Sequence, residues 1–275
     1  MARTDAHNHS TYRHAPGLEG VDLLLADFTS HEYAPHVHDS LVVAVTEVGG
    51  SEFKSRGRTE RASPGALLVF NPGEPHSGRM AGSPRWRYRS LYFAAAGMAR
   101  VLALLEADRP RYFTSNVIEH GRLVQDFLAL HRVLGEAADP LLQQQLLVRC
   151  FTSLHGHGTD RPQGTKGNAA GALPARALDL MHQCHAQPLT LERIAAEAAL
   201  PAYQLIEACK RATGLTPHAY LNQVRLRAAL RALDAGRSLA DAALAAGFYD
   251  QSALHRHFKR TFGMTPLQYV RETLH

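Results

Sequence analysis

Side chains that can hydrogen-bond to the edges of DNA bases gather in one short segment near the end of this 275-residue chain. They are Gln251, Ser252, His255 and Arg256. A glutamine can form two hydrogen bonds with adenine, and an arginine two with guanine, when a rigid element holds them in the major groove. Leu254, Phe258 and Phe262 recur at helical spacing on the other side. We therefore predict a helix over 251–262 whose polar face contacts bases.

The predicted helix belongs to a stretch that occurs twice. Residues 210–220 return as 259–269, with Lys, Arg, Gly, Thr, Pro and Tyr in the same places. A repeat of this kind indicates a duplicated structural unit. Each copy follows two amphipathic helix patterns, which predicts two helix-turn-helix units with second helices over 201–213 and 251–262. A polar helix face that occurs once is more often simply solvated, but duplication of the whole unit favours DNA binding.

The first copy is less suited to base recognition than the second. Tyr203 and Gln204 can reach bases, whereas Ile206 is apolar and the acidic Glu207 would repel phosphates or accept from a cytosine amino group. Lys210 and Lys259 lie further along their helices, where phosphate contact is expected. We predict that the first unit binds more weakly and discriminates less.

Helix start signals continue through the C-terminal part of the chain. The predicted N-caps are Thr190, Thr216, Ser238, Asp250 and Thr265, and Pro217 and Pro266 follow two of them at the first helical position. A long helix over 217–233 separates the two units. The pattern predicts an all-α domain over 173–275.

Charge and composition fit a DNA-binding protein of the cytoplasm. From residue 171 onward there are 12 Lys and Arg against 8 Asp and Glu, so this part carries four of the five net positive charges. A local basic excess suits a polyanionic partner. The polar N-terminus lacks a secretory h-region, no apolar run is long enough for a membrane span, and Cys150, Cys184 and Cys209 are too widely spaced for a zinc pattern.

The N-terminal part has the pattern of a β-domain followed by helices. Short apolar runs, separated by Gly and Pro turns, predict strands over 21–26, 41–45, 66–70 and 86–93, and hence a β-sandwich or barrel. Residues 1–20 are predicted to be a loose arm. Helical spacing over 119–155 predicts an antiparallel helix pair that could dimerise the protein. Residues 156–172 have the composition of a flexible linker.

Residues 173–275 resemble the AraC/XylS family of transcriptional regulators. The resemblance is carried by Ala246-Gly247-Phe248-Tyr249-Asp250-Gln251-Ser252, Phe258-Lys259-Arg260, Phe262-Gly263, Thr265-Pro266 and Tyr269. It implies seven helices, with helix 217–233 holding two recognition helices about one DNA turn apart. By matching position, it implies base contacts from Tyr203, Ile206, Glu207, Gln251, Ser252 and Arg256. One departure is Pro201, where the family usually has a Ser cap.

The N-terminal domain resembles the sugar-binding cupin domain of the same family. The resemblance is carried by His36-Val37-His38 and by Gly65 followed by Asn71-Pro72-Gly73-Glu74-Pro75-His76. It implies a metal site formed by three histidines and a glutamate, but the position of the glutamate falls on Val42 or Val43. Three neutral imidazoles can still hold zinc or iron with one open position. Alternatively, His36, His38 and His76 line an effector pocket or hydrogen-bond within the barrel wall.

The predicted protein is therefore α+β, with a cupin-like effector domain over 1–155, a linker over 156–172 and a DNA-binding domain over 173–275. We predict a homodimeric, non-enzymatic regulator that binds double-stranded promoter DNA and a small-molecule effector, and RNA polymerase if it activates. Effector contacts are predicted from the three histidines and from Arg87 and Arg89 on strand 86–93. Two alternatives remain open: a metal-dependent cupin enzyme with an accessory helical domain, and a constitutive DNA-binding protein whose barrel only dimerises.

Overall fold

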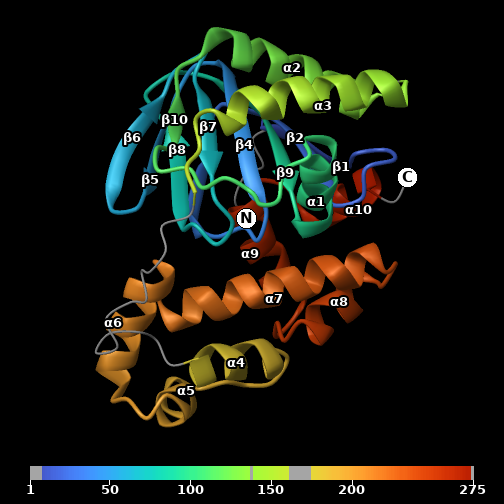
Figure 1. The fold of residues 1–275 in the computed structure, drawn as a ribbon. Coiled ribbons are helices and arrows are strands. Elements are labelled where there is room, and N and C mark those ends of the chain that lie inside the picture. Colours follow the sequence, from blue (N-terminus) through green and yellow to red (C-terminus); the bar gives the residue numbers. More distant parts are fainter. Residues whose placement is uncertain (1–7, 137–138, 161–174, 274–275) are drawn as a thin grey trace. The chain divides into compact units, whose positions relative to one another are not determined.

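The computed structural model describes residues 8–136, 139–160 and 175–273, and the chain divides into two compact units (Figure 1). The first unit comprises 1–32 and 38–161, and the second comprises 33–37 and 162–275. Strand β3 (Glu32–His36) nevertheless pairs with β8 (His76–Met80) in a sheet of the first unit, and it is part of that sheet.

Two β-sheets form the framework of the first unit. Besides β3 and β8, the strands are β1 (His9–His14), β2 (Val21–Phe28), β4 (Leu41–Val48), β5 (Ser51–Ser55), β6 (Arg58–Ala62), β7 (Leu67–Phe70), β9 (Trp86–Phe93) and β10 (Val117–Ile118). The larger sheet has the order β1-β2-β9-β4-β7-β10 and the smaller one β3-β8-β5-β6. A buried cluster that includes Val42, Phe53 and Phe70 joins strands of both sheets. The predicted β-sandwich class is confirmed, as a cupin-like double sheet rather than a closed barrel.

The four predicted strands are β2, β9, β4 and β7, the neighbours at the middle of the larger sheet. Their apolar runs are long because side chains on both faces of this sheet are buried. The prediction of a loose arm over 1–20 is wrong for the described part of it. Residues 9–14 pair with β2 along their whole length, and the Tyr12 hydroxyl donates to Asp22 at 2.7 Å.

Three helices cover the outer face of the larger sheet. They are α1 (Ala95–Leu104), α2 (Gly121–Gly135) and α3 (Pro140–His155). Buried leucines and phenylalanines of α2 and α3 pack on Val43, Leu91 and Phe93 of the sheet. Helices α2 and α3 match the helix pair predicted over 119–155, and their dimerising role stays a prediction.

The start of the predicted linker belongs to the first unit. Thr159 and Tyr112 exchange two backbone hydrogen bonds of 2.8 Å, which tie residues 156–160 to the segment before β10. The remaining linker residues, from 161 to 172, lie outside the described residues.

From residue 175 to residue 273, all regular secondary structure of the second unit is helical (Figure 1). Its helices are α4 (Ala175–Gln183), α5 (Leu191–Glu197), α6 (Ala202–Thr213), α7 (Pro217–Asp234), α8 (Leu239–Ala245), α9 (Gln251–Phe262) and α10 (Pro266–Thr273). Helix α7 lies at the centre and contacts α4, α6, α8, α9 and α10. The described helices include none that is both long and apolar enough to cross a membrane.

All five predicted N-caps form their hydrogen bonds. The side chains of Thr190, Thr216, Ser238, Asp250 and Thr265 each accept from the backbone N–H three residues ahead, at 2.6 to 3.3 Å. Pro201 occupies the N-cap of α6 and offers no such bond. Helices α6 and α9 both end at a left-handed glycine, Gly214 and Gly263. The two helix-turn-helix units, α5–α6 and α8–α9, therefore share one construction.

The turns inside the two units differ in a way that predicts opposite effects of substitution. Ala199 has a φ of 50°, and the matching Gly247 has a φ of 84°. A left-handed conformation costs an L-residue about 1–2 kcal/mol, so we expect Ala199→Gly to raise the free energy of unfolding by about 0.5–1 kcal/mol. Urea unfolding of the full chain, followed by circular dichroism, measures the change.

Gly247→Ala is the matched reverse substitution. An added Cβ would lie 2.3 Å from the carbonyl oxygen of His185, so this variant must lose stability by more than the first one gains. If both substitutions change the free energy of unfolding in the same direction, the assignment of strain to Ala199 is wrong.

Candidate DNA interface and histidine site

Helix α9 places the four side chains predicted to contact bases on one accessible face. Gln251, Ser252, His255 and Arg256 are all exposed. The other side of the helix is fixed by Leu254 and Phe258, which are fully buried. The Asp250 carboxylate accepts from the Ala253 N–H at 2.6 Å and so fixes the N-terminal turn. The predicted base-contacting face is therefore held rigidly from both its flank and its end.

Helix α6 has the same frame but a weaker polar face. Tyr203 and Gln204 are exposed, whereas Ile206 and Glu207 are half-buried. The Glu207 carboxylate forms an ion pair of 3.0 Å with Lys210, the lysine predicted to contact phosphate. This pairing offsets the positive charge of Lys210, although the exposed Arg211 follows it on the same helix.

An exposed aromatic residue beside α9 escaped the sequence prediction. Tyr249 directly precedes the Asp250 cap and is 92% exposed. A fully exposed tyrosine at the start of a recognition helix can hydrogen-bond to a phosphate. The only sequence signal was its place within the family motif over 246–252.

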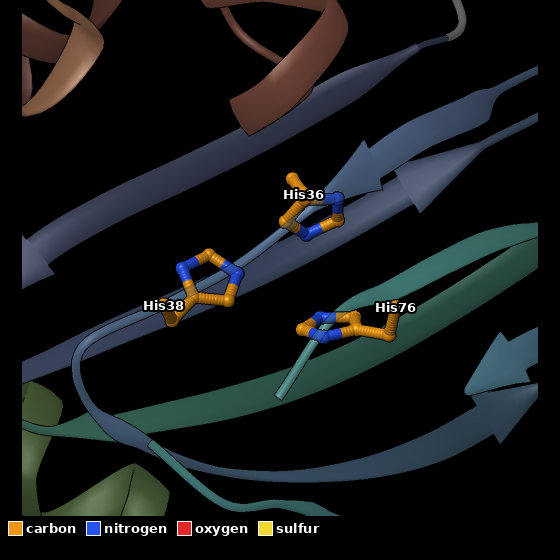
Figure 2. Close-up of side chains that lie close together, drawn as sticks. All are labelled: His36, His38 and His76. Atoms are coloured by element: carbon orange, nitrogen blue, oxygen red, sulfur yellow. The ribbon is translucent and has the colours of Figure 1, made fainter. Parts of the chain in front are cut away.

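The structure brings His36, His38 and His76 together (Figure 2). Their ligating nitrogens all lie within 4.8 Å of one another. His36 ends β3, His76 begins the neighbouring β8, and His38 lies in the connection from β3 to β4. The three imidazoles predicted from the sequence thus form one cluster, from two neighbouring strands and an adjacent turn.

Backbone carbonyls orient two of these rings. The Nδ1 of His36 lies 2.7 Å from the carbonyl oxygen of Ala34, and that of His76 lies 3.0 Å from the oxygen of Glu74. A carbonyl only accepts, so Nδ1 carries the proton and Nε2 carries the lone pair. Burial lowers the pKa of His76, although the neighbouring Glu74 opposes the change. A neutral ring with a directed Nε2 is the form in which histidine binds metal.

Glu74 fixes the turn that presents His76. Its buried carboxylate accepts hydrogen bonds from Ser55 (2.6 Å), Arg56 (2.5 Å), Asn71 (2.8 Å) and Asn116 (2.7 Å). Burial alone would raise the pKa of Glu74, but these hydrogen bonds outweigh burial and lower it. The carboxylate is therefore a charged structural anchor and lies outside the histidine cluster.

Apolar and aromatic side chains border the histidines. The ring of His76 stacks on Phe70 with centroids 4.1 Å apart, and the ring of His38 lies 5.1 Å from that of Tyr92. Val42, at the place of the family's glutamate, is buried. Within the described parts of the chain, the cluster comprises the three histidines and no carboxylate.

Arg87 and Arg89 do not share this site. Successive side chains of a strand point to opposite faces of a sheet. Arg87 and Arg89 are an even number of residues from Leu91, which faces the helices, and an odd number from Tyr92, which faces the histidines. Both guanidiniums bind Glu47 of β4, at 3.1 and 3.0 Å. The predicted effector residues thus fall into two groups on opposite faces of the larger sheet.

Two family models match the chain, one over the unit that holds the histidine cluster and one over the helices of the second unit. An AraC-like ligand-binding domain matches residues 20–150, and a helix-turn-helix domain matches residues 194–272. This chain belongs to the AraC family of transcriptional regulators.

Individual relatives agree with the family. The AraC-family chain is 25% identical over 222 residues to the uncharacterized HTH-type transcriptional regulator YbfI of Bacillus subtilis, covering 80% of this chain and 81% of that protein. It is 28% identical over 210 residues to the transcriptional activator RhaR of Escherichia coli, covering 74% of this chain and 61% of RhaR.

The fold is similar to that of ToxT from Vibrio cholerae, with a TM-score of 0.54 at 9% identity, covering 92% of this chain and 99% of ToxT. A second ToxT structure, with an unsaturated fatty acid bound, gives a TM-score of 0.56 at 10% identity, covering 98% and 97%. The AraC-family chain is a ligand-responsive, DNA-binding regulator, as its two matched domains indicate.

On the outer face of the larger sheet, Arg89 meets a buried histidine. The guanidinium of Arg89 lies 3.3 Å from Nδ1 of His131, whose Nε2 lies 3.1 Å from the carbonyl oxygen of Leu24. The neutral ring, with its proton on Nε2, satisfies both partners. Burial, followed by the charge of Arg89, lowers the pKa of His131 to about 4. A second proton would place positive charge beside Arg89 in a buried position.

His131 therefore makes the stability of the AraC-family protein depend on pH. An unfolded histidine takes up a proton near pH 6.5, whereas folded His131 does so only near pH 4. The stabilisation is complete above pH 6.5 and is lost as the pH falls towards 4, by about 3 kcal/mol. We expect His131→Gln to reduce the difference in unfolding free energy between pH 7 and pH 4.5.

Urea unfolding at the two pH values measures this difference. The exposed His157 provides a matched control, and the His157→Gln variant should show the same difference in unfolding free energy between the two pH values as the wild type. If His131→Gln retains the full difference, another group causes it.

Proposed function

We propose that the protein binds promoter DNA through two successive major grooves and changes its occupancy of that DNA when the first unit binds a small molecule. The observation that supports base recognition is the exposed polar face of α9 on a capped helix with a buried apolar back. Arg256 and Gln251 have the donors and acceptors for guanine and adenine. A regulator of this kind would act in the cytoplasm.

The two helix-turn-helix units contribute unequally in this proposal. Helix α9 combines Gln251, Ser252, His255 and Arg256, and Lys259 follows for a phosphate. Helix α6 offers Tyr203 and Gln204, and the ion pair with Glu207 compensates the charge of Lys210, so that Arg211 is left to supply the net positive charge of this helix. The second unit would therefore supply most of the discrimination between DNA sequences, and the first mainly phosphate contact.

We expect Arg256→Ala to weaken binding about 5- to 150-fold, because one bidentate contact to a base contributes about 1–3 kcal/mol. Gln204→Ala should have a smaller effect. Fluorescence anisotropy measures both affinities, with a DNA fragment that the wild-type protein selects from a random library. Arg100→Ala removes an exposed charge from α1 of the first unit and controls for net charge. Equal losses for Arg256→Ala and Gln204→Ala would refute the asymmetry.

The histidine cluster is proposed to hold a divalent metal ion, zinc or iron, at the polar end of the effector site. The support is the convergence of His36, His38 and His76, two of them with Nε2 selected by a carbonyl bond to Nδ1. Three imidazoles leave one coordination position open, which an oxygen atom of an effector can occupy. The ion would supply Lewis acidity to that ligand, and the protein would orient the rings.

Full-length protein purified without an affinity tag should contain about one equivalent of zinc or iron. His76→Ala should lose the metal while keeping its circular dichroism spectrum, and His131→Gln should keep the metal. Elemental analysis by mass spectrometry measures the content. If the wild type contains no equimolar metal, the three histidines serve only as hydrogen-bonding groups of the effector site.

A homodimer is proposed through the start of α3. Leu141 and Leu142 are 71% and 42% exposed there, which is unusual for neighbouring leucines on a helix. A dimer would present two DNA-binding units to a promoter, and contact with RNA polymerase would follow if the protein activates. The alternative of a metal-dependent cupin enzyme is less well supported, since the histidine cluster of the described residues includes no acid that could act as ligand or base.

A further inference from the structure

We infer that the first unit has a second small-molecule site, on the opposite face of the larger sheet from the histidines, and that it takes a neutral aromatic compound. A cavity of about 440 Å³ lies there between α1, α3 and the segment before β10. Ligand sites for small organic molecules have volumes of about 300–1,000 Å³.

The cavity lies on the other side of the sheet from the histidine cluster. Phe93 lines it and belongs to the core under the helices. Its neighbour Tyr92 points to the opposite face, where its ring lies 5.1 Å from that of His38. The two sites therefore lie on opposite sides of the sheet, and none of the three clustered histidines lines the cavity.

Aromatic rings and a thioether form the walls. The lining includes Met98 and Leu102 of α1, Phe113, and the pair of Phe93 and Phe151. The last two rings meet edge to face with centroids 4.7 Å apart. An aromatic ring of a ligand can pack against such a pair edge to face or offset, and the sulfur of a methionine makes favourable contacts with ring edges. The walls thus select a flat aromatic molecule.

The polar groups at the edge of the cavity favour a neutral ligand. Arg111 lines the cavity and donates to Asp160 at 2.8 Å, so its guanidinium is already engaged. The amide of Asn71 is bound to Glu74 and to the carbonyl oxygen of Phe113. An anionic ligand would have to lose its hydration beside Asp39, which also lines the cavity and would repel it. A hydroxyl group needs only one hydrogen bond, which His155 can provide.

The probe for this site is 2-naphthol, a fluorescent neutral aromatic compound, and the full-length protein is titrated by fluorescence anisotropy. We expect saturable binding of one molecule per chain. The anionic 2-naphthoate has the same ring system and should bind at least about tenfold more weakly. Absence of saturable binding of 2-naphthol, or equal binding of both probes, would overturn the inference.

Two substitutions on α1 locate the probe. Ala99 lines the cavity from an exposed position, so Ala99→Phe fills it without removing a core side chain. Ala103 is exposed on the same helix outside the lining and gives the matched control Ala103→Phe. We expect Ala99→Phe to weaken 2-naphthol at least about tenfold and Ala103→Phe to leave it unchanged.

His76→Ala distinguishes this site from the histidine cluster. Since none of the three histidines lines the cavity, saturable 2-naphthol binding should persist in this variant, whatever its effect on metal content or DNA binding. A loss of 2-naphthol binding in His76→Ala, with Ala99→Phe unaffected, would assign the probe to the histidine site and refute the second site. Circular dichroism and thermal unfolding of each variant verify that the fold is retained.

Discussion

The two-sided burial of the larger sheet governs the first unit. Its central strands send alternate side chains to a core shared with the smaller sheet and to a core under α1, α2 and α3. Strand β9 shows the consequence within a few residues. Tyr92 joins the histidines on one face, while Arg89 meets Glu47 and His131 on the other. Residues of one strand can therefore share a site only when an even number of positions separates them, because only then do their side chains lie on the same face of the sheet.

The second unit was largely predictable because its signals are local. A cap hydrogen bond depends on residues three positions apart, so Thr190, Thr216, Ser238, Asp250 and Thr265 could be identified from the sequence alone. Duplication then doubled the evidence for each element. The bounds of α9 agree with the predicted 251–262, and α6 begins one residue after the predicted Pro201.

The first unit was predictable only in part, because its remaining signals are not local. The strands that are buried on both faces have continuous apolar runs and were predicted. Strands β5, β6 and β8 are rich in polar residues, and their sequences gave no strand signal. The convergence of His36, His38 and His76 followed only from the family resemblance, since β3 and β8 are far apart in sequence. The direction of Arg87 and Arg89 required the register of β9 with β4, and that register includes a bulge between Thr46 and Val48.

The anchoring of Glu74 has a consequence for communication between the two faces of the sheet. Its carboxylate is bound to Asn71, which lines the apolar cavity, and its own carbonyl orients His76 in the histidine cluster. An occupant on either side that shifts this carboxylate must alter the affinity of the other side. Thermodynamic reciprocity makes the two changes equal in size, so one buried acid would couple two chemically different signals before either reaches the DNA.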